Sequence, residues 1–366
     1  MAELKIEQLL RAMVEHKASD LHIRTGVPPI YRINGSLQKI FETRVDPAMM
    51  DSFLDDIMNR DQKNRFEQNK ECDFAVGARD MGRFRVNVFR QRGTIAIVIR
   101  HIKAKIPPFE ELQLPEVIRT LAKTRRGLVL VTGTTGSGKS TTLASMLDYI
   151  NQTDSVNIIT VEDPIEYLYK DCKSIVSQRE IGVDTLSYAN ALRAALRQDP
   201  DVLLVGEIRD LETMQIALTA ADTGHMVFAT IHTTNATETI QRVLSMYPPH
   251  QHDEIRILLS EVLGGIISLR LLPTKDGKGR VPAAEVLVNT GAIKEYIRDK
   301  DKLSLVEQAI ADGHMQYGTQ TFDQALLDLY RSEKITLEVA MDAATNKDDF
   351  DLKVRGISGS SDRGWM

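Results

Sequence analysis

The sequence predicts an α/β protein in which a parallel sheet, covered by helices, is combined with a smaller α+β domain. Its 366 residues suit roughly two domains of about 150 residues each. Between residues 126 and 232, short apolar runs alternate with helical segments, as in a parallel sheet covered on both faces. The first hundred residues instead combine strand signals with two helical segments.

The composition excludes several classes of protein. Hydrophobic residues make up 42% of the chain and charged residues 27%, as in globular proteins that bury a full core. A net charge of −5 gives no overall attraction to nucleic acid or anionic lipid. Two cysteines, Cys72 and Cys172, are too few for a disulfide scaffold or a four-cysteine zinc site. We find no signal peptide and no run of about 20 apolar residues, and we expect a cytoplasmic protein.

The first domain is predicted from local patterns. Asn34-Gly35 is a hairpin turn signal, and Ile106-Pro107-Pro108 interrupts the pattern because a residue before proline is driven to extended backbone. The predicted elements are helices over 4–16 and 47–68 and strands over 19–26, 28–40 and 83–102.

The rest of the chain is predicted in the same way. Residues 250–350 are expected to be mostly helical. The predicted strands are 127–133, 156–162, 201–207 and 225–232, and the predicted helices include 141–151, 186–198, 211–224, 305–313, 322–333 and 337–346. We expect five regions: an N-terminal domain (1–105), a linker (106–125), a core (126–290), a helical C-terminal region (291–355) and a flexible Gly/Ser-rich tail (356–366).

A phosphate-binding loop lies between the first strand of the core and the helix after it. The segment fits GxxxxGK[ST] without a mismatch, and the strand and helix on either side are the context that this motif requires. Backbone N–H groups and the helix N-terminus would bind phosphates, Lys139 would reach the β- and γ-phosphates, and Ser140 would ligate Mg²⁺. The predicted nucleotide-binding residues are Gly133, Thr134, Thr135, Gly136, Ser137, Gly138, Lys139, Ser140 and Thr141.

Carboxylates follow two other strands of the core. In a parallel sheet, ligands bind beyond the carboxyl ends of the strands, so both acidic groups are candidates for metal binding and for activating water. Glu207 follows one strand and resembles a Walker B acid that holds Mg²⁺. Glu162 and Glu166 follow the other strand and compete for the role of general base, and their spacing does not choose between them.

Histidines and arginines complete the set of candidates. His225 and His232 flank a strand, and the segment with His232 leaves it toward the same edge of the sheet as the carboxylates, where an imidazole could sense a γ-phosphate. The strands of the first domain carry several arginines. They could form a solvated face or an anion-binding face, or supply an arginine that neutralises transition-state charge. These arginines are Arg83, Arg85, Arg90, Arg92 and Arg100.

Taken together, these motifs resemble the type IV pilus retraction ATPases of the PilT/PilU family, within the secretion ATPase superfamily. The resemblance covers about residues 5 to 350. The matching segments are GTTGSGKS (Walker A), ITVEDPIEY (aspartate box), LLVGEIRD (atypical Walker B), GHMVFATIHTTNA (histidine box) and ASDLHIRTGVPPIYRINGSL at the start of the N-terminal domain.

The resemblance implies a RecA-like P-loop motor domain, a small PAS-like α+β N-terminal domain and a helical C-terminal region. It implies a homohexamer that uses ATP and Mg²⁺. By analogy, Glu166 is the catalytic glutamate, Glu207 takes the Walker B role, and His225 and His232 take the histidine-box roles. Related ATPases donate two N-terminal-domain arginines to nucleotide, and the sequence here suggests Arg85 and Arg100.

The branch of the family is a finer question. No tetracysteine insert follows the histidine box, which favours retraction over assembly or type II secretion. The AIRNLIRE motif of retraction ATPases is only partly matched by residues 292–299, which read AIKEYIRD. Other features lean toward PilU-like members, so PilT-like and PilU-like roles both stay open.

The functional hypothesis is a motor whose ATP-driven domain closure withdraws pilin subunits during twitching motility. Its expected partners are an inner-membrane pilus platform protein and a second retraction ATPase, with only peripheral membrane association at the pilus base and no nucleic acid. The alternatives are an accessory retraction motor, an assembly or secretion motor, a nucleic-acid translocase, and a noncatalytic partner of another motor.

Overall fold

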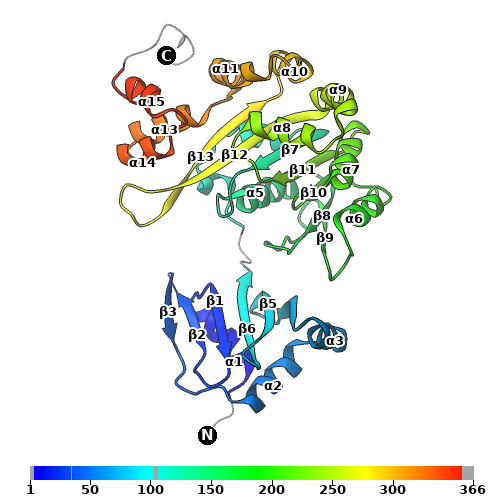
Figure 1. The fold of residues 1–366 in the computed structure, drawn as a ribbon, viewed down its shortest axis with the longest axis vertical. Coiled ribbons are helices and arrows are strands. Elements are labelled where there is room, and N and C mark those ends of the chain that lie inside the picture. The colour runs from blue at the N-terminus through cyan, green and yellow to red at the C-terminus, as the bar shows by residue number, and fades with distance from the viewer. Residues whose placement is uncertain (1–3, 34, 103–105, 357–366) are drawn as a thin grey trace. The chain divides into compact units, whose positions relative to one another are not determined.

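The structure is a computed structural model that describes residues 4–33, 35–102 and 106–356 (Figure 1). The chain divides into two compact units: residues 1–105 together with 166–168, and residues 106–165 together with 169–366. Each unit has its own sheet and its own buried core. The tail predicted beyond Gly356 lies outside the described residues.

The first unit contains a six-stranded antiparallel sheet in the order β3-β2-β1-β6-β5-β4. Its core lies between the sheet and the helices, and it includes Leu9 and Met13 of α1 and Phe53 of α2. The strands are β1 Asp20–Arg24, β2 Ile30–Ile33, β3 Ser36–Lys39, β4 Glu71–Ala78, β5 Gly82–Gln91 and β6 Thr94–Ile102, and the helices are α1 Ile6–Glu15, α2 Pro47–Ile57 and α3 Arg60–Asn69.

Two local features differ from the sequence expectation or refine it. The single helix predicted over 47–68 is two helices, because Met58 is extended and the Asn59 side chain begins α3 by accepting a hydrogen bond from the Gln62 N–H. The predicted hairpin is formed by β2 and β3, with Ile33 opposite Ser36. Asn34 itself is outside the described residues.

The second unit contains a seven-stranded sheet in the order β13-β12-β7-β11-β10-β8-β9. The strands from β12 to β9 are parallel, and β13 is antiparallel to β12. The central strands are buried along their whole length, as expected for a parallel sheet with both faces covered. The strands are β7 Gly127–Thr132, β8 Asn157–Glu162, β9 Ile175–Glu180, β10 Val202–Val205, β11 Met226–Ile231, β12 Leu263–Pro273 and β13 Arg280–Val288.

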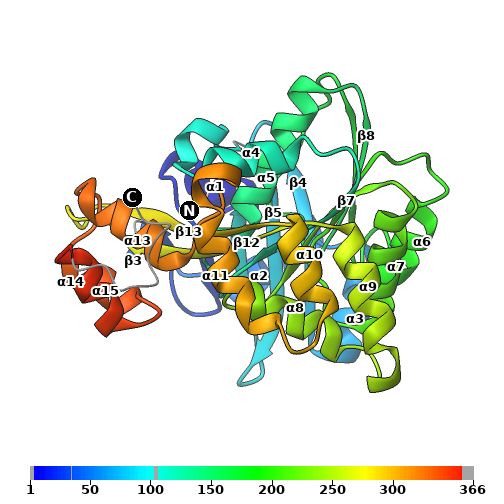
Figure 2. The same cartoon turned by 90° about the horizontal axis from the view of Figure 1, so that it is seen from above.

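Helices cover both faces of this sheet, as Figure 2 shows from above. One face packs against η1 Phe109–Leu112, α4 Glu116–Ala122 and α5 Lys139–Thr153, so residues 106–125 belong to the second unit. The opposite face packs against α6 Tyr188–Ala195, α7 Leu211–Asp222, α8 Ala236–Ser245, α9 His252–Val262, α10 Gly291–Arg298 and α11 Val306–Asp312. The short η2 Pro249–Gln251 lies between α8 and α9, η3 Leu303–Leu305 lies between α10 and α11, and α12 His314–Tyr317 follows α11.

The expectation that residues 250–350 are mostly helical is wrong for β12 and β13, which are long strands at the edge of the sheet. An apolar run such as the one in β12 fits a buried strand or a buried helix equally well by periodicity. Tertiary contact decides for the strand: a Cβ on Gly265 would lie 2.7 Å from the Leu287 carbonyl oxygen of β13.

The C-terminal helices form a separate small core. Phe322, Leu326 and Phe350 pack on Val281 and Ala283 of β13. These helices are α13 Phe322–Arg331, α14 Leu337–Ala343 and α15 Lys347–Val354. Within the part of the chain that the structure describes, no helix is long and apolar enough to cross a bilayer.

Candidate nucleotide site

The phosphate-binding loop joins the buried end of β7 to the first turn of α5. Gly133, Gly136 and Gly138 have φ values of 137°, 81° and 103°, in the left-handed region that glycine adopts without strain. Gly133 also has no room for a side chain, because a Cβ there would lie 2.5 Å from both Leu269 O and Ser137 Oγ. The glycines therefore determine the path of the loop.

The polar groups of this loop match a polyphosphate ligand. Lys139 is 8% exposed, and its Nζ donates to the carbonyl oxygens of Gly133 (2.7 Å) and Thr134 (2.9 Å). Ser137 Oγ is buried and has no hydrogen-bond partner among the described residues. The first N–H groups of α5 have no partner within the helix and form a positive dipole end. Ammonium and N–H donors gathered around a glycine loop are suited to binding phosphate.

The other predicted loop residues surround these groups. Thr134 and Thr135 are exposed on the loop, and Ser140 and Thr141 are half-buried in the first turn of α5. No group of three His, Cys, Asp or Glu side chains that could hold a metal occurs in the described ranges. The Ser140 hydroxyl and the Glu207 carboxylate are oxygen ligands of the kind that Mg²⁺ prefers, and could hold it together with phosphate and water oxygens.

Glu207 lies just beyond β10, at the same edge of the sheet as the phosphate-binding loop. Its Oε2 accepts a hydrogen bond from Arg209 Nη2 at 2.6 Å, and its Oε1 lies 3.2 Å from His232 Nε2. Burial alone would raise the pKa of Glu207, but the Arg209 hydrogen bond and the charges of His232, Arg209 and Lys139 outweigh burial and lower it. Glu207 is therefore held ionised, ready to attract a cation.

Glu162 and Glu166 have different environments. Glu162 ends β8, is 8% exposed, and accepts hydrogen bonds at Oε1 from Thr160 Oγ1 (2.6 Å) and Gln178 Nε2 (3.2 Å). Glu166 is exposed in the loop that follows β8. Glu162 is thus fixed in place, whereas Glu166 is open to solvent.

The two candidate histidines lie at opposite ends of β11. His232 follows the carboxyl end, next to Glu207. His225 precedes the amino end, and its Nδ1 lies 3.0 Å from the Ala220 carbonyl oxygen. A six-residue strand separates them by roughly 20 Å. Within one chain, the fold brings His232 to the acidic group and does not bring His225 there.

Arg85 and Arg100 lie directly opposite each other on β5 and β6 of the first unit. Each has a carboxylate neighbour: Arg85 Nε lies 3.8 Å from Asp73 Oδ1, and Arg100 Nε donates to Asp20 Oδ1 at 2.9 Å. The two guanidinium groups therefore share one face of the antiparallel sheet.

Sequence reasoning did not assign Arg209 and Tyr188, which border Glu207. Arg209 stands two residues after Glu207, within the quoted GEIRD segment, so its proximity was readable from the sequence. The Tyr188 hydroxyl oxygen lies 3.0 Å from the position that a Cβ on Gly206 would take. Burial, together with the charges of Asp163 and Glu207, raises the pKa of Tyr188 and keeps the phenol neutral. Nothing in local spacing places Tyr188 there.

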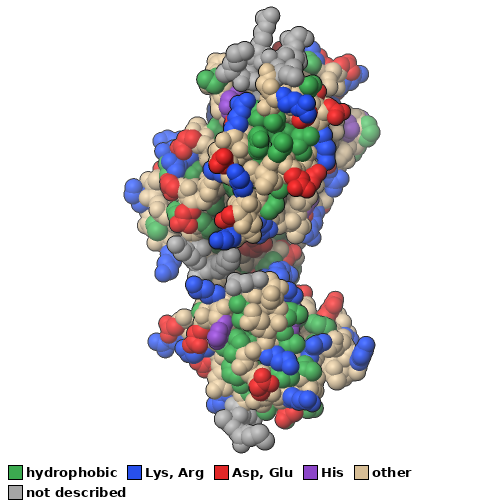
Figure 3. All heavy atoms as spheres, turned by 90° about the vertical axis from the view of Figure 1, so that its left-hand side faces the viewer, with side chains coloured by type: hydrophobic (Ala, Val, Ile, Leu, Met, Phe, Trp, Pro, Cys, Tyr) green, Lys and Arg blue, Asp and Glu red, His purple; other side chains and the backbone are tan. Residues whose placement is uncertain are grey.

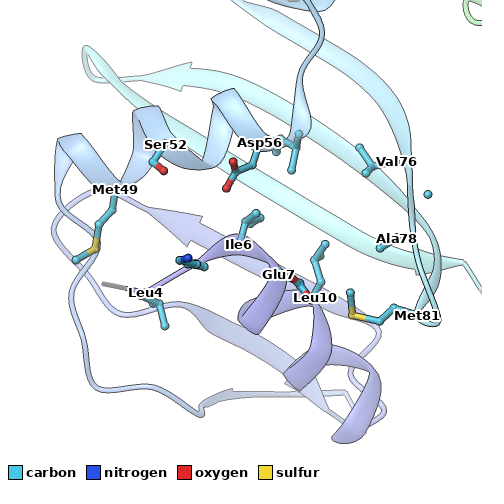
Figure 4. A pocket seen from close by; sticks show the side chains of 13 residues that line it. Leu4, Ile6, Glu7, Leu10, Met49, Ser52, Asp56, Val76, Ala78 and Met81 are labelled. Carbon is cyan, nitrogen blue, oxygen red and sulfur yellow. The ribbon is translucent and has the colours of Figure 1, made fainter. Parts of the chain in front are cut away.

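Two other surface features do not involve these residues. A cavity of about 570 Å³ in the first unit is lined by residues of α1, α2 and the β4–β5 hairpin, with Ile6, Leu10 and Met81 among them (Figure 4). None of the predicted site residues lines it.

On the face shown in Figure 3, basic and acidic side chains are interspersed, without the continuous basic stripe that nucleic-acid binding favours.

Comparison with known proteins identifies the family. Residues 1–294 match the family described as Type II/IV secretion system protein. The chain is 42% identical over 352 residues to the type IV pilus ATPase PilU of Pseudomonas aeruginosa, covering 96% of this chain and 92% of PilU. It is 44% identical over 347 residues to the retraction ATPase PilT of the same organism, covering 95% of this chain and all of PilT.

A solved structure agrees with these sequence matches. The crystal structure of the pilus retraction motor PilT with bound ADP is 48% identical, with a TM-score of 0.89, over 94% of this chain and 98% of PilT. The chain therefore belongs to the Type II/IV secretion system protein family and, within it, to the type IV pilus ATPases of the PilT/PilU kind. The predicted fold class, a RecA-like P-loop domain with a small N-terminal domain and C-terminal helices, is confirmed.

Proposed function

We propose that this protein is a Mg²⁺-dependent ATP-hydrolysing motor that powers type IV pilus retraction. The observation that carries the proposal is that the phosphate-binding loop and the Glu207–His232 pair meet at one edge of a parallel sheet. The PilT and PilU relatives support pilus retraction as the work that hydrolysis drives.

Each residue has a proposed task. Lys139 and the loop N–H groups bind the phosphates, and Ser140 and Glu207 hold Mg²⁺, which when bound neutralises phosphate charge. Glu166 orients or deprotonates the attacking water, because it is open to solvent whereas Glu162 Oε1 already accepts two donors. His232 donates a hydrogen bond toward the γ-phosphate and links its presence to Glu207.

The remaining predictions complete the proposal. Arg85 and Arg100 contact nucleotide through N–H donors that their carboxylate contacts leave unused. His225 has the second histidine-box role, at the end of β11 opposite to Glu207. Nucleotide drives domain closure to the extent that it binds the closed state more tightly than the open one. The working form is a homohexamer at the inner membrane that acts on a platform protein, with a second retraction ATPase as partner.

The test replaces Lys139 with alanine. Purified Lys139→Ala protein should lose ATP hydrolysis by at least about a hundredfold, because the ammonium that contacts the phosphates is gone. Cells whose only copy is Lys139→Ala should carry more surface pili and lose twitching. The exposed Lys300→Ala is the matched control and should behave as wild type.

Each contrary result identifies a rival. Cells without pili would show that the motor works in assembly. Unchanged pili and twitching, together with lost hydrolysis, would contradict retraction as its task. Hydrolysis that survives Lys139→Ala would contradict the site itself.

A further inference from the structure

Glu285 is a buried carboxylate in the second unit to which the proposed reaction gives no task. It lies on β13, is 5% exposed, and its Oε1 accepts a hydrogen bond from the Ala236 N–H at 2.7 Å. Ala236 is the first residue of α8, which begins four residues after His232. Glu285 therefore contacts the start of the helix that follows the histidine loop.

This contact is additional to the ordinary cap of α8. The Asn235 side chain already accepts a hydrogen bond from the Glu238 N–H at 2.8 Å, as an N-cap residue does. Glu285 satisfies a second N–H of the same helix end from a different element of the fold. Ala236 is fully buried, so this contact both satisfies an N–H that has no partner within the helix and connects the helix to the sheet.

The same carboxylate is connected to the phosphate-binding loop through the sheet. Glu285 is opposite Ser268, Ser268 is opposite Thr132, and Thr132 is opposite Ile231 in adjacent strands. Thr132 Oγ1 donates to Ser268 Oγ at 3.0 Å, and both are fully buried. Thr132 directly precedes Gly133, and Ile231 directly precedes His232.

Residues 232–235 are consequently held at both ends. Ile231 is fixed in the sheet, and Ala236 is fixed by Glu285. Between these ends, Thr233 shares a buried hydrogen bond of 2.7 Å with Thr239 of α8. The segment presents His232 Nε2 to Glu207 Oε1 at 3.2 Å.

Retaining a carboxyl in this place is unfavourable for folding alone. Burial, with smaller contributions from the charges of Glu307 and Asp323, raises the pKa of Glu285 to about 7, although the Ala236 N–H and Arg270 oppose this change. A neutral amide would accept the Ala236 N–H without the cost of a buried charge, whereas an apolar side chain would leave that N–H without an acceptor. The position of the carboxyl, between the sheet and the histidine loop, suggests a task connected with His232.

We propose that Glu285 is a positioning residue that holds His232 against Glu207 by fixing the start of α8. The inference rests on the proposed function, since it assigns to Glu285 a part in ATP hydrolysis. Glu285 touches neither nucleotide nor water in this scheme and acts only through the histidine loop.

The experiment compares Glu285→Leu, which has similar volume but no acceptor, with Glu285→Gln, which keeps an oxygen for the Ala236 N–H. In Glu285→Leu, kcat for ATP should fall roughly tenfold while ADP affinity stays within about twofold of wild type. Glu285→Gln should recover most of the lost kcat. The double variant Glu285→Leu/His232→Ala should be no slower than His232→Ala alone, because the two residues act as a unit.

Asp323→Leu supplies the matched control. Asp323 is another buried carboxyl, and its Oδ1 accepts a hydrogen bond from the Thr345 N–H at 2.9 Å, in the C-terminal helices. The Asp323→Leu variant should be less stable than wild type but should keep the wild-type kcat. Unchanged kcat in Glu285→Leu, loss of ADP binding in that variant, or a further additive loss in the double variant would each overturn the inference.

The proposed function fails in a different way. If wild-type hydrolysis does not depend on Lys139, the ATPase proposal is wrong whatever Glu285 does. If hydrolysis depends on Lys139 and Glu285→Leu is unaffected, only the inference about Glu285 is wrong.

Discussion

Close contacts around Gly206 leave no room for a larger residue next to Glu207. Gly206 directly precedes Glu207, its N–H donates to the Val161 carbonyl oxygen at 2.8 Å, and its own carbonyl oxygen accepts from Thr230 Oγ1 at 2.6 Å. A Cβ on Gly206 would lie 3.0 Å from Tyr188 Oη and 3.1 Å from the Val161 carbonyl oxygen. The backbone that carries Glu207 is therefore tightly enclosed.

We predict that Gly206→Ala lowers ATPase activity and destabilises the protein by about 1–3 kcal/mol, because the added methyl group overpacks a rigid site. Chemical denaturation and steady-state hydrolysis measure the two effects. Gly291→Ala is the matched control, since a Cβ there meets nothing within 4 Å. Adding Tyr188→Phe to Gly206→Ala should restore part of the stability. A Gly206→Ala protein as stable and active as wild type would contradict this prediction, because it would show that the backbone shifts to accommodate the added methyl group.

At the same scale, the sequence motif anticipates the local geometry of the loop, while the roles of its residues stay predictions. The loop glycines and Lys139 lie as the motif requires, because positive φ and a short strand-to-helix connection are local properties. Arg209 and Tyr188 were missed. His232 lies toward the carboxylates, as the direction of a parallel strand predicts, and His225 lies at the other end of that strand.

Among the elements, the C-terminal helices depend on their caps. Thr321 begins α13 with a capping box: its Oγ1 accepts from the Gln324 N–H at 3.3 Å, and the Gln324 side chain accepts from the Thr321 N–H at 2.9 Å. Gln324 also donates to the Ala311 carbonyl oxygen of α11 at 3.2 Å. One capping pair therefore connects two helices.

We predict that Thr321→Ala lowers the free energy of unfolding by about 1 kcal/mol, the usual value for a lost N-cap. Thr321→Ser keeps the hydroxyl and should remain close to wild type. Thermal or urea unfolding measures the difference, and ATP hydrolysis should be unchanged in both variants. A loss of stability in Thr321→Ser equal to that in Thr321→Ala would mean that the methyl group matters and the cap does not.

Elements were predicted unevenly from the sequence. The buried strands β7, β8, β10 and β11 were found because their apolar runs alternate with helices. The edge strands β4 and β9 were missed because β9 is mostly polar and the apolar segment of β4 covers only residues 74–76. The strands β12 and β13 lay in a region expected to be mostly helical, since only pairing across the sheet distinguishes a long apolar strand from a helix.

For the molecule as a whole, Glu285 makes stability depend on pH. Burial raises its pKa to about 7 from an ordinary value of 4.5, so the folded protein keeps a proton that the unfolded chain releases. The cost of ionising Glu285 in the folded protein is absent below pH 4.5, grows as pH rises toward 7 and is complete above pH 7, so stability falls with rising pH. Arg270 opposes this shift, and Glu307 and Asp323 reinforce it.

We predict that wild-type stability, measured relative to Glu285→Gln, falls by about 3 kcal/mol between pH 5 and pH 8. Urea unfolding of both proteins at equal concentration across this range gives the difference. Parallel stability curves would mean that Glu285 titrates normally in the folded protein, contrary to this expectation.

The sequence by itself determined the fold class, the phosphate-binding loop and the acidic group after each of two strands, because all three depend on contacts between residues close along the chain. Only the tertiary structure decided which of these groups meet. The pairing of His232 with Glu207, and of Glu285 with the start of α8, joins residues 25 and 49 positions apart. Such contacts arise from strand order and direction, which burial of the whole sheet selects and no local pattern encodes.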